Sequence, residues 1–138
     1  MMDFADIPFV RSLGLELLVC EGGHSEVRFP TRPEHMNSFG ITHGGACMAL
    51  LDVALARAAR SVAPELGIVT IEMKTSFLRP AKGVLLGKGR LLHRTHTLAF
   101  TEGSIVDARG RVCAHATGTF RYLSPAPEAG APASPTND

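Results

Sequence analysis

A single long helix is the feature that most limits how this chain can fold. Residues 43–62 carry small or branched apolar side chains on almost every side, and the charged interruptions are Asp52, Arg57 and Arg60. At 1.5 Å per residue such a helix is about 30 Å long. A helix without a polar face is buried on nearly all sides, so the rest of the chain must surround it.

Strand patterns fill most of the remaining sequence. Residues 13–20 and 25–30 flank a turn in which Gly22 and Gly23 supply permissive dihedrals, and they predict a hairpin. Four more strand-like segments follow the helix: 68–78, 84–94, 98–107 and 111–122. Because strands in series with short turns form antiparallel sheets, we expect an α+β fold in which one sheet curls around the helix. One helix cannot cover both faces of that sheet, so association with a second copy is also expected.

Composition limits the number of domains and the class of partner. A chain of 138 residues is the size of one domain, which we place at residues 1–122 and which opens with a short or broken helix over 4–13. Residues 123–138 hold four prolines and little to bury, so they predict a disordered tail. A hydrophobic content of 45% and a net charge of +1 indicate a globular protein and argue against binding to nucleic acid or a membrane.

Cysteine and histidine usage argues against a metal or disulfide framework. Cys20, Cys47 and Cys113 are widely spaced and form no CxxC pair, so they predict reduced, packed thiols. His93 and His96 are three residues apart on a predicted strand and therefore face opposite sides. We expect no metal and no other cofactor. The N-terminus carries acids where a signal peptide carries basic residues, which predicts a cytoplasmic protein.

Two features of the long helix are unfavourable for helix stability unless they serve a function: the glycines at its start and the aspartate in its middle. Gly44 and Gly45 open it, although glycine costs about 1 kcal/mol against alanine in a helix. Exposed N–H groups at a helix start, with no Cβ in the way, form a site for a developing negative oxygen. Asp52 lies in mid-helix, where no neighbour three or four residues away can neutralise it. Two plainer interpretations stay open: the glycines could serve packing alone, and Asp52 could be exposed or paired with a distant arginine.

A set of residues with characteristic spacing surrounds the helix start: Asn37, Gly40, His43, Gly44, Gly45 and Asp52. This spacing resembles the signature of hotdog-fold acyl-CoA thioesterases of the PaaI-like, phenylacetate-degradation type in the 4-hydroxybenzoyl-CoA thioesterase superfamily. The resemblance covers about residues 3–122. It implies a hotdog fold, with an antiparallel five- to six-stranded sheet wrapped around one central helix. It also implies a homodimer with a continuous sheet, further paired as a dimer of dimers, with active sites between protomers.

The same resemblance implies a role for each polar group. The Gly44 backbone N–H is the main donor to the oxyanion, and the Asn37 side-chain amide is a second donor or positions water. Asp52, from the partner chain, is the nucleophile or the base that activates water. Thr70 stands where some members carry a water-orienting serine.

These roles fit the chemistry of thioester hydrolysis. The reaction passes through a tetrahedral oxyanion that oriented N–H donors stabilise, while a carboxylate attacks or activates water. His43 and Gly45 then border the substrate, with His43 a helix-start residue rather than a general base.

Basic residues predict a handle for coenzyme A. Residues 73–101 contain no acid but several cations: Lys74, Arg79, Lys82, Lys88, Arg90 and Arg94, together with His93 and His96. Coenzyme A carries a 3′-phosphate and a diphosphate, so we expect contacts from Arg79, Lys82, Arg90, Arg94 and His96. The alternative is a solvated strand face whose charges aid solubility.

The acyl group is not determined by the sequence. Several apolar residues could line an acyl cavity or belong to the ordinary core: Met36, Phe39, Met48, Leu51, Leu55 and Phe77. We therefore predict hydrolysis of an aryl- or medium-chain acyl-CoA. A non-catalytic acyl-CoA-binding or sensing protein is the alternative, and a hydratase is disfavoured because His43 is the nearby candidate for its histidine base.

Overall fold

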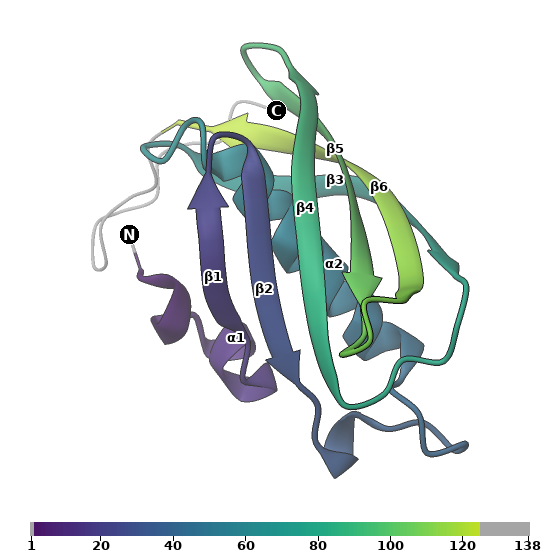
Figure 1. Cartoon of the computed structure of the whole chain (residues 1–138). Helices are drawn as coiled ribbons and strands as arrows, with labels where there is room; N and C mark the ends of the chain where they lie inside the picture. The colour runs from purple at the N-terminus through teal and green to yellow at the C-terminus, as the bar shows by residue number, and fades with distance from the viewer. Residues whose placement is uncertain (1, 125–138) are drawn as a thin grey trace.

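An antiparallel sheet curls around the long helix in the computed structural model, which describes residues 2–124 (Figure 1). The elements of this part of the chain are η1 (Phe4–Asp6), α1 (Pro8–Leu13), β1 (Glu16–Glu21), β2 (His24–Pro30), η2 (Pro33–His35), α2 (Gly44–Arg60), β3 (Gly67–Phe77), β4 (Val84–Arg94), β5 (Leu98–Val106) and β6 (Val112–Leu123). The predicted α+β fold is confirmed, with six strands within the described residues. Of the tail predicted at 123–138, Leu123 is instead the last residue of β6, and residues 125–138 lie outside the described range, so their disorder stays a prediction.

The order of the strands differs from their order in the chain. The sheet runs β1-β2-β4-β5-β6-β3, and every pairing is antiparallel. Strand β3 follows α2 directly in sequence, yet it pairs with β6 at the far edge of the sheet. The chain therefore passes along α2 from one half of the sheet to the other, and β1 and β3 are left as edges.

Glycine allows α2 to lie very close to the sheet. A Cβ on Gly89 of β4 would lie 2.4 Å from the carbonyl oxygen of Ala54 in α2, so no larger residue fits. The Ser25 hydroxyl of β2 donates to the same carbonyl at 2.5 Å. These contacts fix the helix backbone against β2 and β4.

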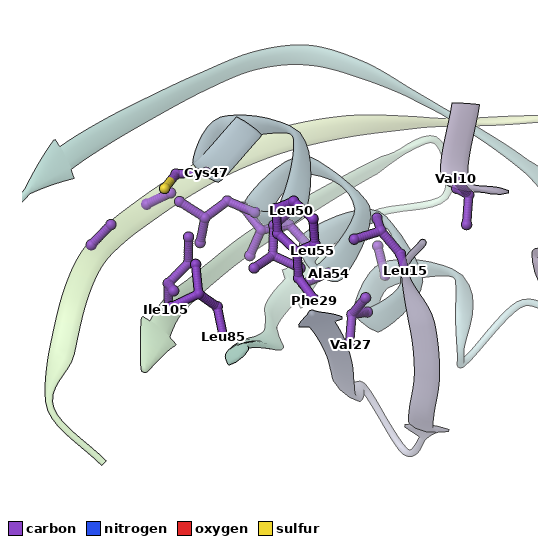
Figure 2. Close-up of a cluster of buried hydrophobic side chains, with 14 of the residues drawn as sticks. Val10, Leu15, Val27, Phe29, Cys47, Leu50, Ala54, Leu55, Leu85 and Ile105 are labelled. Atoms are coloured by element: carbon purple, nitrogen blue, oxygen red, sulfur yellow. The ribbon is translucent and has the colours of Figure 1, made fainter. Parts of the chain in front are cut away.

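The core lies between α2 and the inner face of the sheet. Figure 2 shows Leu50, Ala54 and Leu55 of α2 among side chains contributed by β2, β4 and β5. Leu51 and Leu55, which the sequence left as candidates for an acyl cavity, are fully buried members of this core. The helix itself is placed as predicted, two residues shorter at its C-terminal end.

Candidate active site

The start of α2 leaves one glycine amide free and engages the other. His43 is the N-cap, and its Nδ1 accepts a hydrogen bond from the Gly45 N–H at 2.9 Å. The Gly44 N–H begins the helix and so has no acceptor within it. No other group among residues 2–124 bonds to this N–H. Of the two glycines, Gly44 therefore keeps its N–H available to a ligand, and His43 caps the start of the helix.

The two polar groups of the Asn37 side chain have different roles: its oxygen holds the loop, and its NH₂ is free for a ligand. Its Oδ1 accepts from the N–H groups of Phe39 at 2.9 Å and Ile41 at 3.2 Å, which holds the turn before the helix. The side-chain NH₂ makes no hydrogen bond within the described residues. The loop thus orients this amide while leaving both of its hydrogens available.

Asn37 and Gly44 line one cavity of about 440 Å³. Its walls come from the loop, the first turn of α2, the end of β3 and the start of β6: Asn37, Ile41, Thr42, Gly44, Cys47, Phe77, Leu78, Arg79, Pro80, Ala81, Cys113 and Ala114. The walls are mainly apolar, and two of the lining residues, Asn37 and Gly44, carry N–H donors that are not bonded within the described residues. This combination suits an acyl group whose carbonyl oxygen reaches the donors.

Asp52 is bonded to Thr70 rather than to an arginine. The Thr70 hydroxyl of β3 donates to Asp52 Oδ1 at 2.6 Å, and Asp52 is half-buried. Asp52 and Thr70 do not lie beside the helix start of their own protomer, which agrees with the expectation that Asp52 acts from the partner chain. Asp52 follows Gly44 by eight residues of α2, which is about 12 Å along the axis. One thioester carbonyl cannot reach both groups of the same chain.

The predicted basic residues are spread over two regions. Arg79 lines the cavity and donates to the Val112 carbonyl at 2.9 Å, and exposed Lys82 follows the cavity residue Ala81. Arg90, by contrast, forms an ion pair with Glu102 of the neighbouring strand.

The remaining basic residues, Arg94 and His96, lie at the C-terminal end of β4 and just after it, and neither lines the cavity. The Arg94 guanidinium lies 4.3 Å from the ring centre of Tyr122, and His96 is exposed in the turn after β4. The acid-free stretch stops one residue before Glu102, and the β4–β5 pairing returns that acid to Arg90. The basic stretch is therefore partly neutralised across the sheet.

The apolar candidates also separate. Phe77 lines the cavity, whereas Phe39 is 85% exposed on the loop and Met48 is 39% exposed on α2, and neither lines it. Sequence reasoning missed Cys47 and Cys113 as cavity residues. Cys113 reaches the cavity because Phe77 pairs with Ala114, which brings the start of β6 to the end of β3, and no local sequence pattern indicates that pairing.

Burial keeps the cavity thiols protonated. Burial raises the pKa of Cys47 to about 11, with a smaller contribution from the nearby Cys113. Burial also raises the pKa of Cys113 above its usual range. Both groups are therefore neutral wall atoms at ordinary pH, which fits an apolar pocket.

Residues 2–124 contain neither a cluster of metal ligands nor a membrane-spanning helix. No three histidine, cysteine, aspartate or glutamate side chains group closely enough to hold a metal ion. No helix in this part of the chain is long and apolar enough to cross a membrane.

Comparison with known proteins identifies the family. The model of the thioesterase superfamily matches residues 39–114. SSO2140 of Saccharolobus solfataricus, which carries a provisional esterase name, is 31% identical over 112 residues that span 80% of each chain.

Solved structures agree. The conserved protein PA5202 from Pseudomonas aeruginosa is 28% identical with a TM-score of 0.80, covering 83% of this chain and 93% of that one. A variant of the phenylacetic acid degradation protein PaaI from Thermus thermophilus is 26% identical with a TM-score of 0.77, covering 84% and 99%. The resemblance to PaaI-like hotdog proteins is thus confirmed, and the chain belongs to the thioesterase superfamily as a thioester hydrolase.

Proposed function

We propose that the protein hydrolyses an acyl-CoA thioester to a free acid and coenzyme A, in a site that two protomers complete. The observation that carries this proposal is that Gly44 and Asn37 line the same mainly apolar cavity, while the Gly44 N–H and the Asn37 side-chain NH₂ are not bonded within the described residues. The acyl group, aryl or medium-chain, fills the cavity. PaaI of T. thermophilus, named for phenylacetic acid degradation, supports the aryl choice.

The two donors stabilise the charge that develops during the reaction. The thioester oxygen accepts from the Gly44 N–H and the Asn37 amide and gains negative charge as the carbonyl carbon becomes tetrahedral. Because both donors are held in place beforehand, they cost little reorganisation when that charge appears. Loss of one such donor typically costs about 3 kcal/mol in the barrier.

Asp52 of the second protomer supplies the attack. As a base it takes a proton from water while the water oxygen bonds to the carbonyl carbon, after which the C–S bond breaks and the proton passes to the thiolate. As a nucleophile its oxygen bonds to the carbonyl carbon, and the C–S bond breaks to give an anhydride and the thiolate. Water then opens the anhydride and supplies the proton that the thiolate takes. Thr70 donates to Asp52 and orients its carboxylate in either route. Label in Asp52 after a single turnover in H₂¹⁸O identifies the nucleophilic route, because water that opens the anhydride at the Asp52 carboxyl carbon leaves its oxygen there, whereas the base route never labels Asp52.

Coenzyme A is held from the mouth of the cavity. Arg79 lines the cavity and Lys82 is exposed just beyond it, so these two cations are placed to meet phosphates. Arg90 and Arg94 lie on β4 and His96 lies in the turn after it, and because none of the three lines the cavity we leave them out of this part of the proposal.

The dimer is supported by the edge strand β3. Val69 and Ile71 are 45% and 53% exposed on this edge, although both are large apolar residues. An apolar edge with unpaired backbone groups readily joins a second sheet. We propose a homodimer through this edge and the pairing of two such dimers, both measurable as molecular mass in solution.

Removal of the Asp52 carboxylate tests the function. We predict that Asp52→Asn lowers kcat at least about 100-fold, because the amide neither attacks nor removes a proton. The assay is release of free thiol from a panel of aryl-, short- and medium-chain acyl-CoAs.

Folding and binding provide the controls for this variant. Thermal unfolding of Asp52→Asn should remain within a few degrees of the wild type, since the amide can still accept from Thr70. Unchanged turnover in the variant would contradict the proposed role. Acyl-CoA binding by the wild type without thiol release would instead favour the non-catalytic alternative.

A further inference from the structure

The ring of Phe77 lies directly against Gly44. A Cβ added to Gly44 would lie 3.3 Å from Phe77 Cζ, 3.7 Å from Cε1 and 3.9 Å from Cε2. The ring is 54% exposed, and both residues line the same cavity. An apolar ring that is half open beside a cavity offers a surface for a ligand, and this one lies beside the proposed oxyanion donor.

A bulge in β3 brings Phe77 to this position. Thr70 and Phe77 are seven residues apart and would face opposite sides of a regular strand. The pairing with β6 shifts between Thr70 and Glu72, which places one extra residue, Ile71, in β3. Before the bulge the even-numbered residues of β3 face α2, and after it the odd-numbered residues do. Thr70 can therefore bond to Asp52 while Phe77 packs against Gly44 on the same face.

The pairs on either side of the bulge confirm the change of phase. Thr70 pairs with the buried Phe120 on the inner face. Glu72 pairs with Thr119 on the outer face, and the Thr119 hydroxyl donates to its carboxylate at 2.6 Å. The bulge therefore lets one edge strand serve both parts of the site, as bulges beside active sites do when they redirect a side chain.

The position of the ring limits the shape of the acyl group next to its carbonyl. A carbonyl oxygen bonded to the Gly44 N–H lies about 2.9 Å from that nitrogen, so the acyl group starts in the part of the cavity that Gly44 and the Phe77 ring border together. Leu78, Pro80 and Ala81 add apolar wall to the same cavity, and the one cation among its lining residues is Arg79, assigned above to coenzyme A. The acyl chain therefore belongs against the Phe77 ring, and the charged coenzyme belongs at Arg79.

We propose that Phe77 is a specificity-determining residue that packs beside the reacting carbonyl and selects acyl groups unbranched at the α-carbon. This inference rests on the proposed thioesterase function. A flat or straight acyl group lies along the ring, whereas a methyl branch at the α-carbon meets the ring edge that already touches Gly44. Discrimination of this kind, one methyl group against a packed wall, is typically worth about 10- to 200-fold in kcat/KM.

Pairs of substrates that differ in α-branching test the inference. The first pair is hexanoyl-CoA and its isomer 2-methylpentanoyl-CoA, and the second is phenylacetyl-CoA and 2-phenylpropanoyl-CoA. We expect the wild type to prefer the unbranched member of each pair. Phe77→Ala should reduce that preference about ten-fold or more, through a gain on the branched substrates. Phe9→Ala removes a ring of similar exposure, 60%, from α1 and should leave the preference unchanged.

A double-mutant cycle tests the contact itself. Gly44→Ala keeps the backbone N–H but adds the Cβ that meets Phe77, so kcat/KM should fall. The same change made in the Phe77→Ala background should cost about ten-fold less, because the tight contact with the ring is gone. Equal costs in the two backgrounds, or an equal loss on branched and unbranched substrates, would overturn the role of Phe77. A wild type inactive on every acyl-CoA would overturn the proposed function instead.

Discussion

At the residue scale, some polar groups of the site are hydrogen-bonded within the loop and the helix start and hold their shape, while others stay free for a ligand. Asn37 Oδ1 accepts hydrogen bonds that hold the loop, while the side-chain NH₂ of Asn37 stays free. His43 Nδ1 accepts from the Gly45 N–H, while the Gly44 N–H stays free. The spacing of Asn37, Gly44 and Asp52 was readable from the sequence together with its resemblance. Which polar atoms of Asn37 are bonded and which are free could not be predicted from the sequence, because this depends on which loop N–H groups point back at the asparagine.

Asn37→Asp separates the two functions of that side chain. We predict that kcat falls about 100-fold or more, because a donor is lost and a negative charge faces the oxyanion. The remaining oxygen can still accept from Phe39 and Ile41, so the melting temperature should change little. Asn37→Ala is the matched control, and it should lower both kcat and the melting temperature. Wild-type turnover in Asn37→Asp would rule out the amide as a donor.

Cys47 gives a prediction about pH. Its pKa in the folded protein is about 11 against an ordinary value of 9.0. The folded state therefore holds this proton more tightly than the unfolded chain does. Its contribution to stability is complete below pH 9.0 and is lost as the pH rises to about 11.

Thermal unfolding across this pH range checks the prediction. The melting temperature of the wild type should fall more steeply between pH 9 and 11 than that of Cys47→Ala, while the two curves run parallel below pH 9. Parallel curves throughout the range would show that Cys47 does not keep its proton in the folded state.

At the scale of elements, the helix and strands were predictable, and their arrangement was less so. The helix predicted at 43–62 is Gly44–Arg60, and the last four strands lie within a residue or so of their predicted bounds. These follow from local periodicity. The pairing of β3 with β6 and the extra residue Ile71 do not, because they depend on contacts between distant segments. The meeting of Arg90 with Glu102 was missed for the same reason.

The close approach of α2 to the sheet leads to a prediction about stability. Gly89→Ala places a Cβ 2.4 Å from the Ala54 carbonyl oxygen, and backbone cannot move aside cheaply. We expect a loss of about 2–3 kcal/mol in the free energy of unfolding, measured by urea denaturation. Lys88→Ala, on the outer face of the same strand, is the control and should cost less than about 1 kcal/mol. Equal effects of the two changes would contradict the tight helix–sheet contact.

At the scale of the whole molecule, the two halves of the proposed site do not meet within one chain. Gly44 and Asn37 line the cavity, while Asp52 lies about 12 Å further along α2 with Thr70. The apolar edge of β3 offers a surface on which a second copy can bring its own Asp52 to the cavity. Individual residues in the sequence could indicate the chemistry, but whether the site is shared depends on the assembly.

A mixed dimer tests the shared site most directly. One copy carries Asp52→Asn and the other Asn37→Asp, and the two are co-expressed with different tags so that the mixed dimer can be purified. Each homodimer should be nearly inactive, whereas the mixed dimer should regain about half of the wild-type thiol release, because one of its two sites keeps both native residues. A mixed dimer as inactive as the two homodimers would contradict a site formed between protomers.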